Sequence, residues 1–458
     1  MEKVSIPQGK HLNPIPTGPK GHWLLGVMPD INRDPLGFFQ NTSQYGPIFS
    51  FRFFIWSGIM VNHPDYIKHI LQENYKNYTK QTHDYQLMKP IVGAGLLTSE
   101  GDFWLRQRRL IQPAFHRHRI QSFGTLMADS TLQMLERWQS EPFRSEPFDV
   151  SNEMMRLTLS IVGKALFSQD LSHEAEAVGR SFTVASDYTS RKLRSVVLLS
   201  GGKEYRQAIS ELDRVVMEII AERRSRKDRI EEDRNEDLLD MLLNARDEDT
   251  GQGMTDKQLR DEVITLLLAG HETTANALSW TWYLLSENPD VYHRLQAELK
   301  TILNGRIPEM DDLPNLPYTR MVIQESMRLY PPAWIISRRA ESEDIVDGYR
   351  IPSKSILHLS SYVMHRNPDY WDKPEVFDPE RFCPERSIGR PAFAYFPFGG
   401  GPRLCIGRDF AMAEAQLILA TVASRCRLEL VPGHPVVPDP QITLRLKHGL
   451  QMLKQEVR

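Results

Sequence analysis

The longest regular pattern in the chain is an apolar stretch that runs from about Thr255 to Glu287. Its centre, VITLLLAGHETTANALSW, is hydrophobic on nearly every side, which is typical of a helix buried all round. Thr255 and Gln258 have the spacing of a capping box, and Asn288-Pro289 ends the pattern. The sequence therefore predicts one long buried helix, and the glycine and the acid-alcohol pair inside it need a chemical reason.

The rest of the chain is mostly helical in pattern, with short β segments. We expect a β hairpin over Phe49–Val61 with its turn at Ser57-Gly58, and further short strands in IISRRA and DGYRIP. A last helix is predicted from Arg408 to about Cys426. The mixed-charge run Glu222–Asp237 predicts a solvated helix end and loop. The predicted fold class is mainly α with a minor β part.

Composition and charge narrow the class of protein. The 458 residues show no repeat or linker, so we expect a single domain over 1–458, with residues 1–25 as an extended arm. The net charge of −3 gives no reason to expect nucleic-acid binding. Three cysteines without a C-x-x-C pair fit a reducing compartment. Because the N-terminal region lacks an apolar run of about 20 residues, we expect a soluble, cytoplasmic protein without a membrane span.

The segment FGGGPRLCIG, residues 398–407, carries the most specific chemistry in the chain. Its glycines allow the backbone to pass close to a flat ligand. Cys405 lies just before the last predicted helix, where free N–H groups and the helix dipole favour a thiolate. Arg403 stands two residues earlier and can meet an anionic group.

This segment matches F-x-x-G-x-R-x-C-x-G and resembles the haem-binding signature of the cytochrome P-450 superfamily. The resemblance implies the P-450 fold, with haem b (iron protoporphyrin IX) between the long central helix and the cysteine-loop helix. It also implies that Cys405 is the axial iron ligand and that Phe398, Gly399 and Gly407 belong to the haem-binding loop. Cys383 and Cys426 lack such a context and are expected to be core thiols.

Inside the long helix, AGHETT is similar to the oxygen-activation motif of the same family. Gly270 removes side-chain bulk where the helix could face a bound diatomic molecule. Thr273 offers a hydroxyl beside O2, and Glu272 can relay protons from solvent. Ala269 is expected to face the haem. His271 is expected to be a packing or hydrogen-bonding residue.

A second pair of motifs concerns the scaffold. Glu325 and Arg328 lie one helical turn apart, which by itself predicts only a surface pair. The resemblance implies instead that they form a buried charge network with Arg381 of the segment FDPERF. We expect these three residues to matter for haem incorporation and not for the chemical step.

Cationic and indole groups are expected around the haem propionates, because two carboxylates inside a protein need compensation. Trp104 and Arg108 are four residues apart on a short predicted helix and resemble the family's W-x-x-x-R pattern. Arg338 matches the family's propionate arginine and is preferred to its neighbour Arg339. Arg403 completes the expected set.

The sequence specifies the substrate less closely than the cofactor. The mostly apolar candidate positions suit a lipophilic molecule. Besides Ala269 and Thr273, they are Tyr85, Leu87, Met88, Leu97, Ala333, Trp334, Ile335 and Ile336. Fatty-acid hydroxylases of this family hold the carboxylate with an Arg and a Tyr near the first sheet, where this chain has Trp56 and Met60. A fatty acid, a terpenoid and a steroid-like molecule therefore all remain candidates.

The resemblance implies a monooxygenase that inserts one atom of O2 by hydroxylation or epoxidation. Electrons from NAD(P)H would arrive through a separate ferredoxin or flavodoxin-type donor and its reductase. The basic stretch RQRRLIQPAFHRHR, residues 106–119, is an ordinary solvated face or a docking site for that donor. A peroxide-driven peroxygenase or isomerase is the alternative enzyme, and a non-catalytic haem carrier or sensor is the alternative outside enzymes.

Overall fold

A computed structural model describes residues 13–195, 202–227, 237–246, 251 and 253–456 of the chain. The chain forms two compact units. The first contains residues up to Tyr85 together with Ile335–Pro374 and Arg390–Leu404. The second contains Gln86–Trp334, Glu375–Gly389 and Cys405–Arg458. Predominantly helical structure with a smaller sheet part agrees with the predicted fold class.

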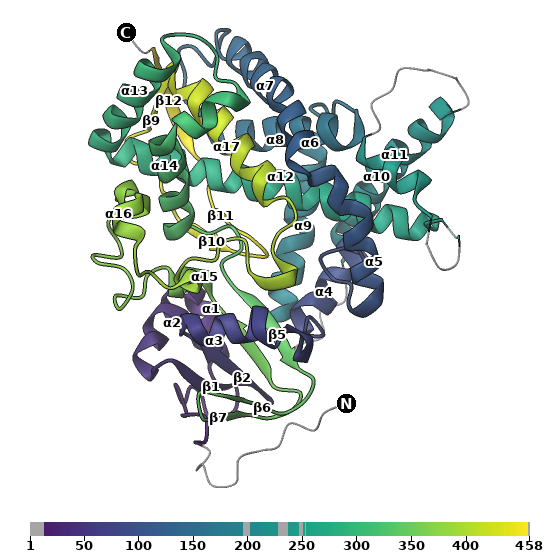
Figure 1. Ribbon diagram of the computed structural model, residues 1–458, viewed down its shortest axis with the longest axis vertical. Helices are drawn as coiled ribbons and strands as arrows, with labels where there is room; N and C mark the ends of the chain where they lie inside the picture. Colours follow the sequence, from purple (N-terminus) through teal and green to yellow (C-terminus); the bar gives the residue numbers. More distant parts are fainter. Residues whose placement is uncertain (1–12, 196–201, 228–236, 247–250, 252, 457–458) are drawn as a thin grey trace. The chain divides into compact units, whose positions relative to one another are not determined.

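The first unit is built on a five-stranded sheet with the order β1-β2-β8-β5-β3 (Figure 1). Its strands are β1 (Ile48–Phe53), β2 (Trp56–Val61), β3 (Tyr78–Thr79), β5 (Ile336–Ala340) and β8 (Ile356–Leu359). Strands β2 and β8 are parallel, and the other pairs are antiparallel. Apolar side chains from the sheet and from helix α3 (Pro64–Lys68) form the core, including Ile59, Ile67 and Leu357.

Short elements complete this unit. They are α1 (Met28–Arg33), α2 (Pro35–Asn41), the first residues of α4 (His83–Val92), α15 (Ser361–Met364) and the hairpin β6 (Asp344–Val346) and β7 (Tyr349–Ile351). Single-turn helices lie at Thr42–Tyr45, His69–Glu73, Tyr75–Asn77, Ala392–Ala394 and Gly401–Arg403. The expected arm falls partly on residues 1–12, which lie outside the described residues; Thr17 forms a bridge with Ser50 of β1.

The predicted turn of the first hairpin is wrong. Strands β1 and β2 are joined at Phe54-Ile55, and Phe54 has φ 55. Ser57 and Gly58 instead belong to β2. A Cβ on Gly58 would lie 2.7 Å from the Phe51 ring, so this glycine makes room for a cross-strand aromatic side chain and does not form a turn.

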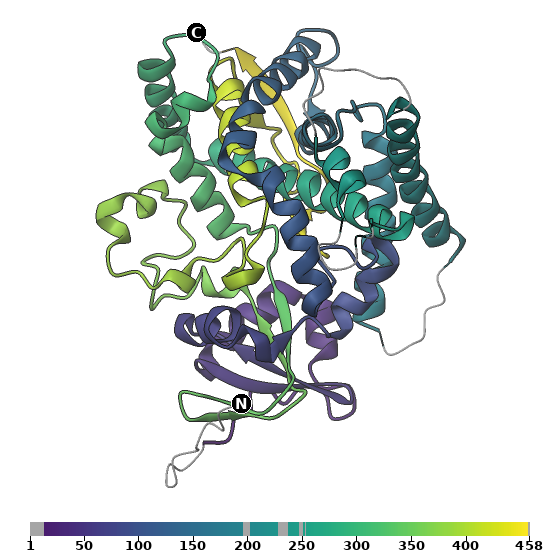
Figure 2. The ribbon, with the colours of Figure 1, turned by 45° about the vertical axis from the view of Figure 1, so that its right-hand side comes forward.

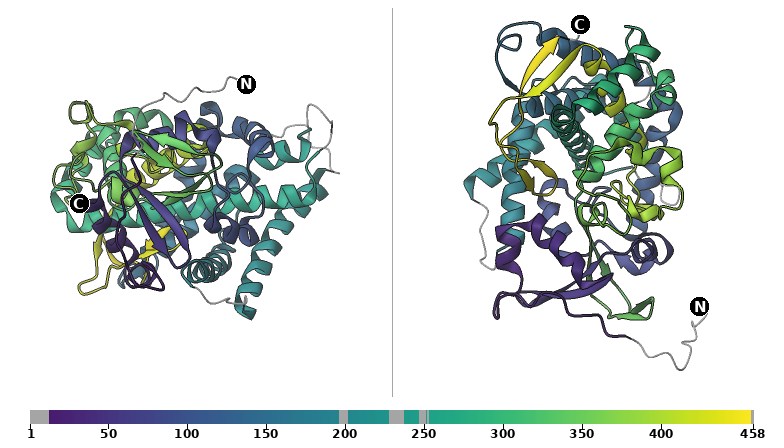
Figure 3. Two further views of the ribbon diagram at one scale, coloured as in Figure 1. Left: turned by 90° about the horizontal axis from the view of Figure 1, so that it is seen from below. Right: turned by 90° about the vertical axis from the view of Figure 1, so that its left-hand side faces the viewer.

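The second unit is built around α12 (Asp256–Glu287), which is buried along most of its length (Figure 2). Thr255 caps it through the predicted capping box, in which its side chain accepts a hydrogen bond from the Gln258 N–H. The right-hand view of Figure 3 looks nearly along its axis and shows other helices of this unit on several sides. Helix α8 (Val150–Phe167) and helix α17 (Arg408–Ala423) are among those that pack on it.

The remaining elements of this unit surround that core. Its other helices are α5 (Gly101–Ile111), α6 (Arg117–Ser122), α7 (Gly124–Arg137), α9 (Ala175–Leu193), α10 (Lys203–Lys227), α11 (Leu238–Asn244), α13 (Pro289–Leu303), α14 (Pro317–Leu329) and α16 (Pro384–Ser387). Single-turn helices lie at Gln112–Phe115, Met310–Asn315 and Pro379–Phe382. The strands are β4 (Phe148–Asp149), β9 (Cys426–Leu430) and β12 (Gln451–Glu456) in one sheet, and β10 (Pro438–Pro440) with β11 (Leu444–Leu446) in another.

Two boundaries differ from the predictions. Helix α17 ends at Ala423, and Cys426 begins β9, where it pairs with Glu456 of β12. Helix α10 extends into the mixed-charge run, whose residues 228–236 lie outside the described residues. Arg223 in that run is buried and donates hydrogen bonds to Asp237 (2.6 Å), so this residue is not part of a solvated face. Among the described helices, none has the length and apolar character needed to cross a membrane.

Candidate active site

Near its middle, helix α12 is exposed on one face. Between Asp261 and Ser286, Ala269 is the only exposed residue, and Thr273, one turn later, is partly exposed. The Thr273 hydroxyl donates a hydrogen bond to the Ala269 carbonyl oxygen at 2.8 Å. A helix that is otherwise buried thus presents a small, low-relief face with one hydroxyl, which suits a flat ligand held against it.

Gly270 has a different role from the one expected. A Cβ added there would lie 3.0 Å from Cγ2 of Val162 on α8, tighter than ordinary packing. The glycine therefore lets α8 approach α12 closely. The missing side chain points toward α8, whereas Ala269 and Thr273 form the open face.

Glu272 is fully buried next to that open face. Its Oε1 accepts a hydrogen bond from the Thr443 hydroxyl at 2.8 Å. Burial raises the pKa of Glu272 to about 7, and the bond from Thr443 and the charge of Arg445 oppose this rise. A carboxyl with this pKa holds or releases a proton near neutral pH, as proton delivery requires.

His271, the neighbour of Glu272, is predicted to be a packing or hydrogen-bonding residue. Its ring is buried, and burial lowers its pKa to about 4, so it is neutral at pH 7. Its backbone carbonyl accepts a hydrogen bond from the Thr158 hydroxyl of α8 at 3.0 Å. These contacts are those of a core residue between two helices.

Cys405 carries an exposed thiol three residues before the start of α17. Burial lowers the pKa of Arg108 on α5, and the nearby Cys405 opposes this effect. Trp104, one turn before Arg108, is buried on the same helix. The second unit thus places a thiol, a guanidinium and an indole within one region.

The glycine loop before Cys405 requires glycine at particular positions. Gly399 and Gly401 have φ values of 71 and 62. A Cβ on Gly401 would lie 1.8 Å from the Leu71 carbonyl oxygen, and one on Gly400 would lie 2.2 Å from the Phe393 ring. The loop therefore passes along the sheet unit in a conformation that side chains would block. Phe398 is half-buried there, and Gly407 caps α17 in the second unit.

The two candidate arginines of β5 lie in different environments. Arg338 is buried, and it and Arg403 both oppose the rise in the pKa of Tyr85 that burial causes. Arg339 instead pairs with Glu341 at 2.9 Å. Arg338 and Arg403 therefore both lie near Tyr85 in the first unit.

Glu325, Arg328 and Arg381 form a buried network. Arg328 donates to both carboxylate oxygens of Glu325, at 2.6 and 2.8 Å, and Arg381 Nε donates to Oε1 at 3.3 Å. The Asp378 N–H donates to the same oxygen at 2.9 Å. All three side chains are nearly inaccessible, so the surface-pair alternative does not apply.

The candidate substrate residues divide between the units. In the first unit Tyr85 is buried, and Ile335 and Ile336 are partly buried. In the second, Leu87, Met88 and Leu97 are partly buried and Ala333 is exposed. Trp334 is buried, and its Nε1 donates to the Gln441 carbonyl oxygen at 3.0 Å, which identifies it as an anchor for that segment.

Leu87 lines a cavity of about 270 Å³ in the second unit. The other walls include Tyr188 and Lys192 of α9 and Tyr205 of α10. The two tyrosine rings lie 4.2 Å apart. These residues could not be predicted from the sequence, because they lie on amphipathic helices and belong to no motif.

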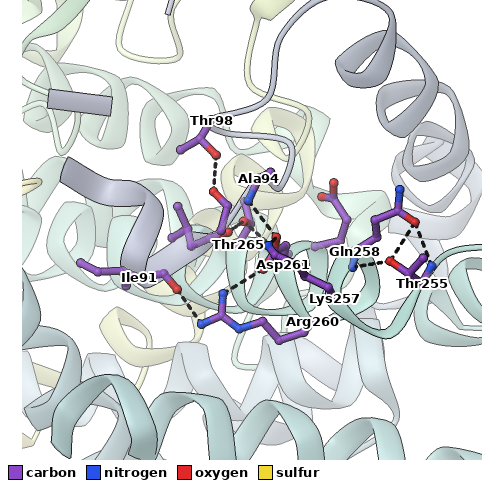
Figure 4. Close-up of polar contacts among 12 residues, drawn as sticks. Ile91, Ala94, Thr98, Thr255, Lys257, Gln258, Arg260, Asp261 and Thr265 are labelled. Atoms are coloured by element: carbon purple, nitrogen blue, oxygen red, sulfur yellow. Dashed lines mark hydrogen bonds and ion pairs between the residues drawn. The ribbon is translucent and has the colours of Figure 1, made fainter. Parts of the chain in front are cut away.

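A polar cluster at the start of α12 was also missed (Figure 4). Asp261 accepts a hydrogen bond from the Ala94 N–H at 2.9 Å. Glu262 accepts from the Leu96 N–H and from Gln107 Nε2, both at 3.0 Å. The loop that carries Leu97 and the helix that carries Trp104 and Arg108 are therefore both bound to α12.

The residues present fit a haem. The structure holds an exposed cysteine thiol before α17, a small open face on α12, and Arg108 near the thiol in the second unit. A thiolate ligand, a low-relief distal face and cations for propionates are what iron protoporphyrin needs from a protein.

Comparison with known proteins agrees with this fit. The family model described as Cytochrome P450 matches residues 16–453. The chain is 36% identical to cyclooctatin synthase of Streptomyces melanosporofaciens, over 93% of this chain and 91% of that protein. It is 33% identical to leukotriene-B4 omega-hydroxylase 3 of Mus musculus, over 96% and 89%. The crystal structure of the cytochrome P450DA haem domain aligns with a TM-score of 0.87 at 25% identity, covering 98% of this chain and 99% of that one.

The fold and site define a haem-binding oxygenase, and the chain belongs to the cytochrome P450 family. It is a cytochrome P450 monooxygenase that uses haem and O2. A second Streptomyces melanosporofaciens relative, cyclooctat-9-en-7-ol 5-monooxygenase, is 34% identical over 91% of this chain and 90% of that protein.

Proposed function

We propose that the protein hydroxylates or epoxidises a lipophilic cyclic molecule of the terpenoid type, with electrons from separate redox partners. The observation that carries the proposal is the open face of Ala269 and Thr273 next to the buried carboxyl of Glu272. Two relatives named for cyclooctatin chemistry support this substrate class. The presence of Trp56 and Met60 where fatty-acid hydroxylases carry Arg and Tyr argues against a carboxylate-bearing chain.

Each protein group has a defined task in this proposal. Bound haem supplies the activation of O2 and the oxidation of the substrate carbon. The Cys405 thiolate, favoured by the start of α17, would hold the haem iron. Trp104 and Arg108 are the proposed partners of a propionate, and the resemblance gives Arg338 and Arg403 the same role.

Thr273 and Glu272 are the proposed proton-handling pair. Thr273 orients the proton at its hydroxyl, and Glu272 gives up its carboxyl proton and recovers one from solvent. A Glu272 pKa of about 7 supports this role, because both protonation states are populated at neutral pH. Replacement of Thr273 by Ala should let electron consumption continue while product per electron pair falls.

The proposal has two direct tests. A reduced, CO-bound spectrum with its Soret band near ~450 nm is expected for thiolate ligation. A band near ~420 nm in freshly prepared protein would contradict the assignment of Cys405. For the substrate class, a cyclic diterpene alcohol should shift the ferric haem spectrum by displacing water, whereas dodecanoic acid should do so only weakly.

We propose that electrons from NAD(P)H arrive through a ferredoxin or flavodoxin-type protein and its reductase. The basic residues of α5 and α6 support this, since Arg109 and Arg117 are exposed. An acidic donor would be steered to them electrostatically. The proton-handling pair argues against the peroxide-driven alternative, which has no need of it.

A further inference from the structure

Glu272 meets a polar group from a distant part of the chain. Thr443 stands one residue before β11 and is buried. Its hydroxyl donates to Glu272 Oε1 at 2.8 Å, and its oxygen accepts from Asn276 Nδ2 at 3.2 Å. Because an amide nitrogen can only donate, the single hydroxyl proton of Thr443 is directed at the carboxyl of Glu272.

Backbone contacts hold Thr443 in this place. The Leu444 N–H donates to the Pro332 carbonyl oxygen at 2.9 Å. The Leu444 carbonyl oxygen in turn accepts from Trp280 Nε1 of α12 at 3.1 Å. These two bonds hold the backbone next to Thr443 against α12.

Arg445 brings a charge to the same strand. It stands two residues after Thr443, so both side chains leave the strand on one side. Its guanidinium donates to Asp187 Oδ1 at 2.7 Å and to the Thr183 hydroxyl at 3.0 Å, both on α9, and to Asp439 Oδ2 at 3.2 Å on β10. The cation that acts on Glu272 is thus anchored to α9 and β10.

We propose that Thr443 is a positioning residue for proton delivery, which orients the carboxyl of Glu272 through a hydrogen bond to Oε1, beside Asn276, whose side chain also bonds to Glu272. This rests on the proposed role of Glu272. Asp187 and Asp439 fix the position of Arg445. The charge of Arg445 favours the ionised form of Glu272 and thereby promotes release of the proton. The proton that leaves the carboxyl of Glu272 is replaced by one from bulk water, and no electron passes through these residues.

The other titratable groups on the packed elements do not replace Arg445. His271 on α12 is neutral, because burial lowers its pKa to about 4. Burial raises the pKa of Glu414 on α17 well above its ordinary value, which favours its neutral form. Arg445 is therefore the cation that favours the ionised form of Glu272 among these described groups.

Infrared titration of the purified haem protein tests the proposal without a substrate. A protonated carboxyl has a C=O stretching band, and the band that is absent from the Glu272→Gln variant is assigned to Glu272. Thr443→Val should raise the midpoint of this band by about one pH unit, because a hydrogen bond to the charged form is lost. Thr443→Ser should restore the wild-type midpoint. Thr281→Val, which removes a buried hydroxyl of α12 that donates to the Ala277 carbonyl oxygen of the same helix, is the matched control and should leave the midpoint unchanged.

A coupling assay with a surrogate ferredoxin and reductase adds the functional readout. The hydrogen peroxide released per NADPH oxidised should rise several-fold in Thr443→Val in the presence of a cyclic diterpene alcohol, and remain near wild type in Thr443→Ser. Arg445→Gln is a second variant that keeps Thr443, and it too should raise the midpoint of the Glu272 band.

Several outcomes would overturn the proposal. It fails if Thr443→Val titrates as wild type does, or if its midpoint moves while the peroxide yield stays unchanged. The absence of any band that Glu272→Gln removes would also overturn it. A failure of the proposed function is separate and would appear as a missing ~450 nm band or as normal coupling in Glu272→Gln.

Discussion

Two glutamates of α12 are buried, and their hydrogen-bond partners decide what each can do. Glu262 accepts hydrogen bonds from the Leu96 N–H and Gln107, which are parts of a loop and a helix that it holds in place. Glu272 accepts from Thr443 and adjoins the open face of the helix. Burial raises both pKa values to about 7. The same physical shift thus supports structure at one residue and proton exchange at the other.

Glu262 makes the protein less stable as the pH rises. Its pKa is about 7 in the folded state and near 4.5 in the unfolded chain, so the folded state binds its proton more tightly. The contribution of this carboxyl to the free energy of unfolding is fully present below pH 4.5 and is lost as the pH rises through 7. The difference, at about 1.4 kcal/mol per pH unit, amounts to about 3 kcal/mol.

The variant Glu262→Gln should therefore lose part of this pH dependence. Urea unfolding at pH 5 and pH 8 measures it, with haem content held equal. The free energy of unfolding should fall less between the two pH values in the variant than in the wild type. Equal losses in both proteins would show that Glu262 is ionised in the folded state.

At this scale the sequence identifies chemistry that lies within one motif. Thr273 and Glu272 are adjacent, and Cys405 lies in a fixed pattern, so the resemblance to the family could propose a role for each. Thr443 could not, because 171 residues separate it from Glu272 and a lone threonine before a short strand carries no signal. Contacts between distant segments arise from the tertiary packing, which the local pattern does not encode.

Among the elements, the loop before α5 depends on close contact with α12. A Cβ on Gly95 would lie 2.2 Å from the Thr265 hydroxyl and 2.4 Å from the Asp261 carbonyl oxygen. Gly93, with φ 62, is confined by the Asp261 carboxylate in the same way. The loop is therefore a packed part of the core of its unit, although its sequence resembles a flexible turn.

Gly95→Ala should destabilise the protein by about 1–3 kcal/mol, since the loop must move away from α12. Gly179 on α9 offers the control, because a Cβ there meets nothing within 4 Å. Gly179→Ala should instead stabilise by up to about 1 kcal/mol through helix propensity. Thermal unfolding of both variants compares them, and a Gly95→Ala protein as stable as the wild type would refute the close contact.

The network of α14 and the segment after it leads to a second prediction at this scale. Arg381→Ala leaves the buried Glu325 with one cation fewer, which should cost about 3–5 kcal/mol and lower haem retention. Arg386 pairs with Asp378 in an exposed position, so Arg386→Ala should cost less than about 1 kcal/mol. Haem content after purification and urea unfolding measure the effect. Equal behaviour of the two variants would contradict the buried network.

Element prediction succeeded where the pattern was long and failed where it was short. The capping box and the apolar run located α12 to within a residue at its start. The hairpin turn was misplaced, because Ser57-Gly58 has turn composition while Gly58 actually accommodates the Phe51 ring. The end of α17 was misplaced as well, since β9 takes Cys426 into a sheet with a strand near the C-terminus.

For the whole molecule, the feature that matters most for function is that the local charge of one stretch differs in sign from the net charge. The net charge is −3, yet residues 106–119 are locally basic. Arg109 and Arg117 in this stretch are exposed, as a docking surface requires. An acidic electron donor would therefore be attracted to one region of a chain that is otherwise slightly acidic.

Reversal of these charges should weaken electron transfer without altering the haem. Arg109→Glu with Arg117→Glu should raise the ferredoxin concentration for half-maximal reduction about tenfold at low salt, and the difference should shrink as ionic strength rises. Arg180→Glu on α9, an exposed arginine outside the stretch, is the control and should change it little. Stopped-flow reduction under CO measures the rate, because the reduced protein is trapped as it forms. If the double variant and the control behave alike at low salt, the basic stretch is a solvated face, and the donor must dock through other residues.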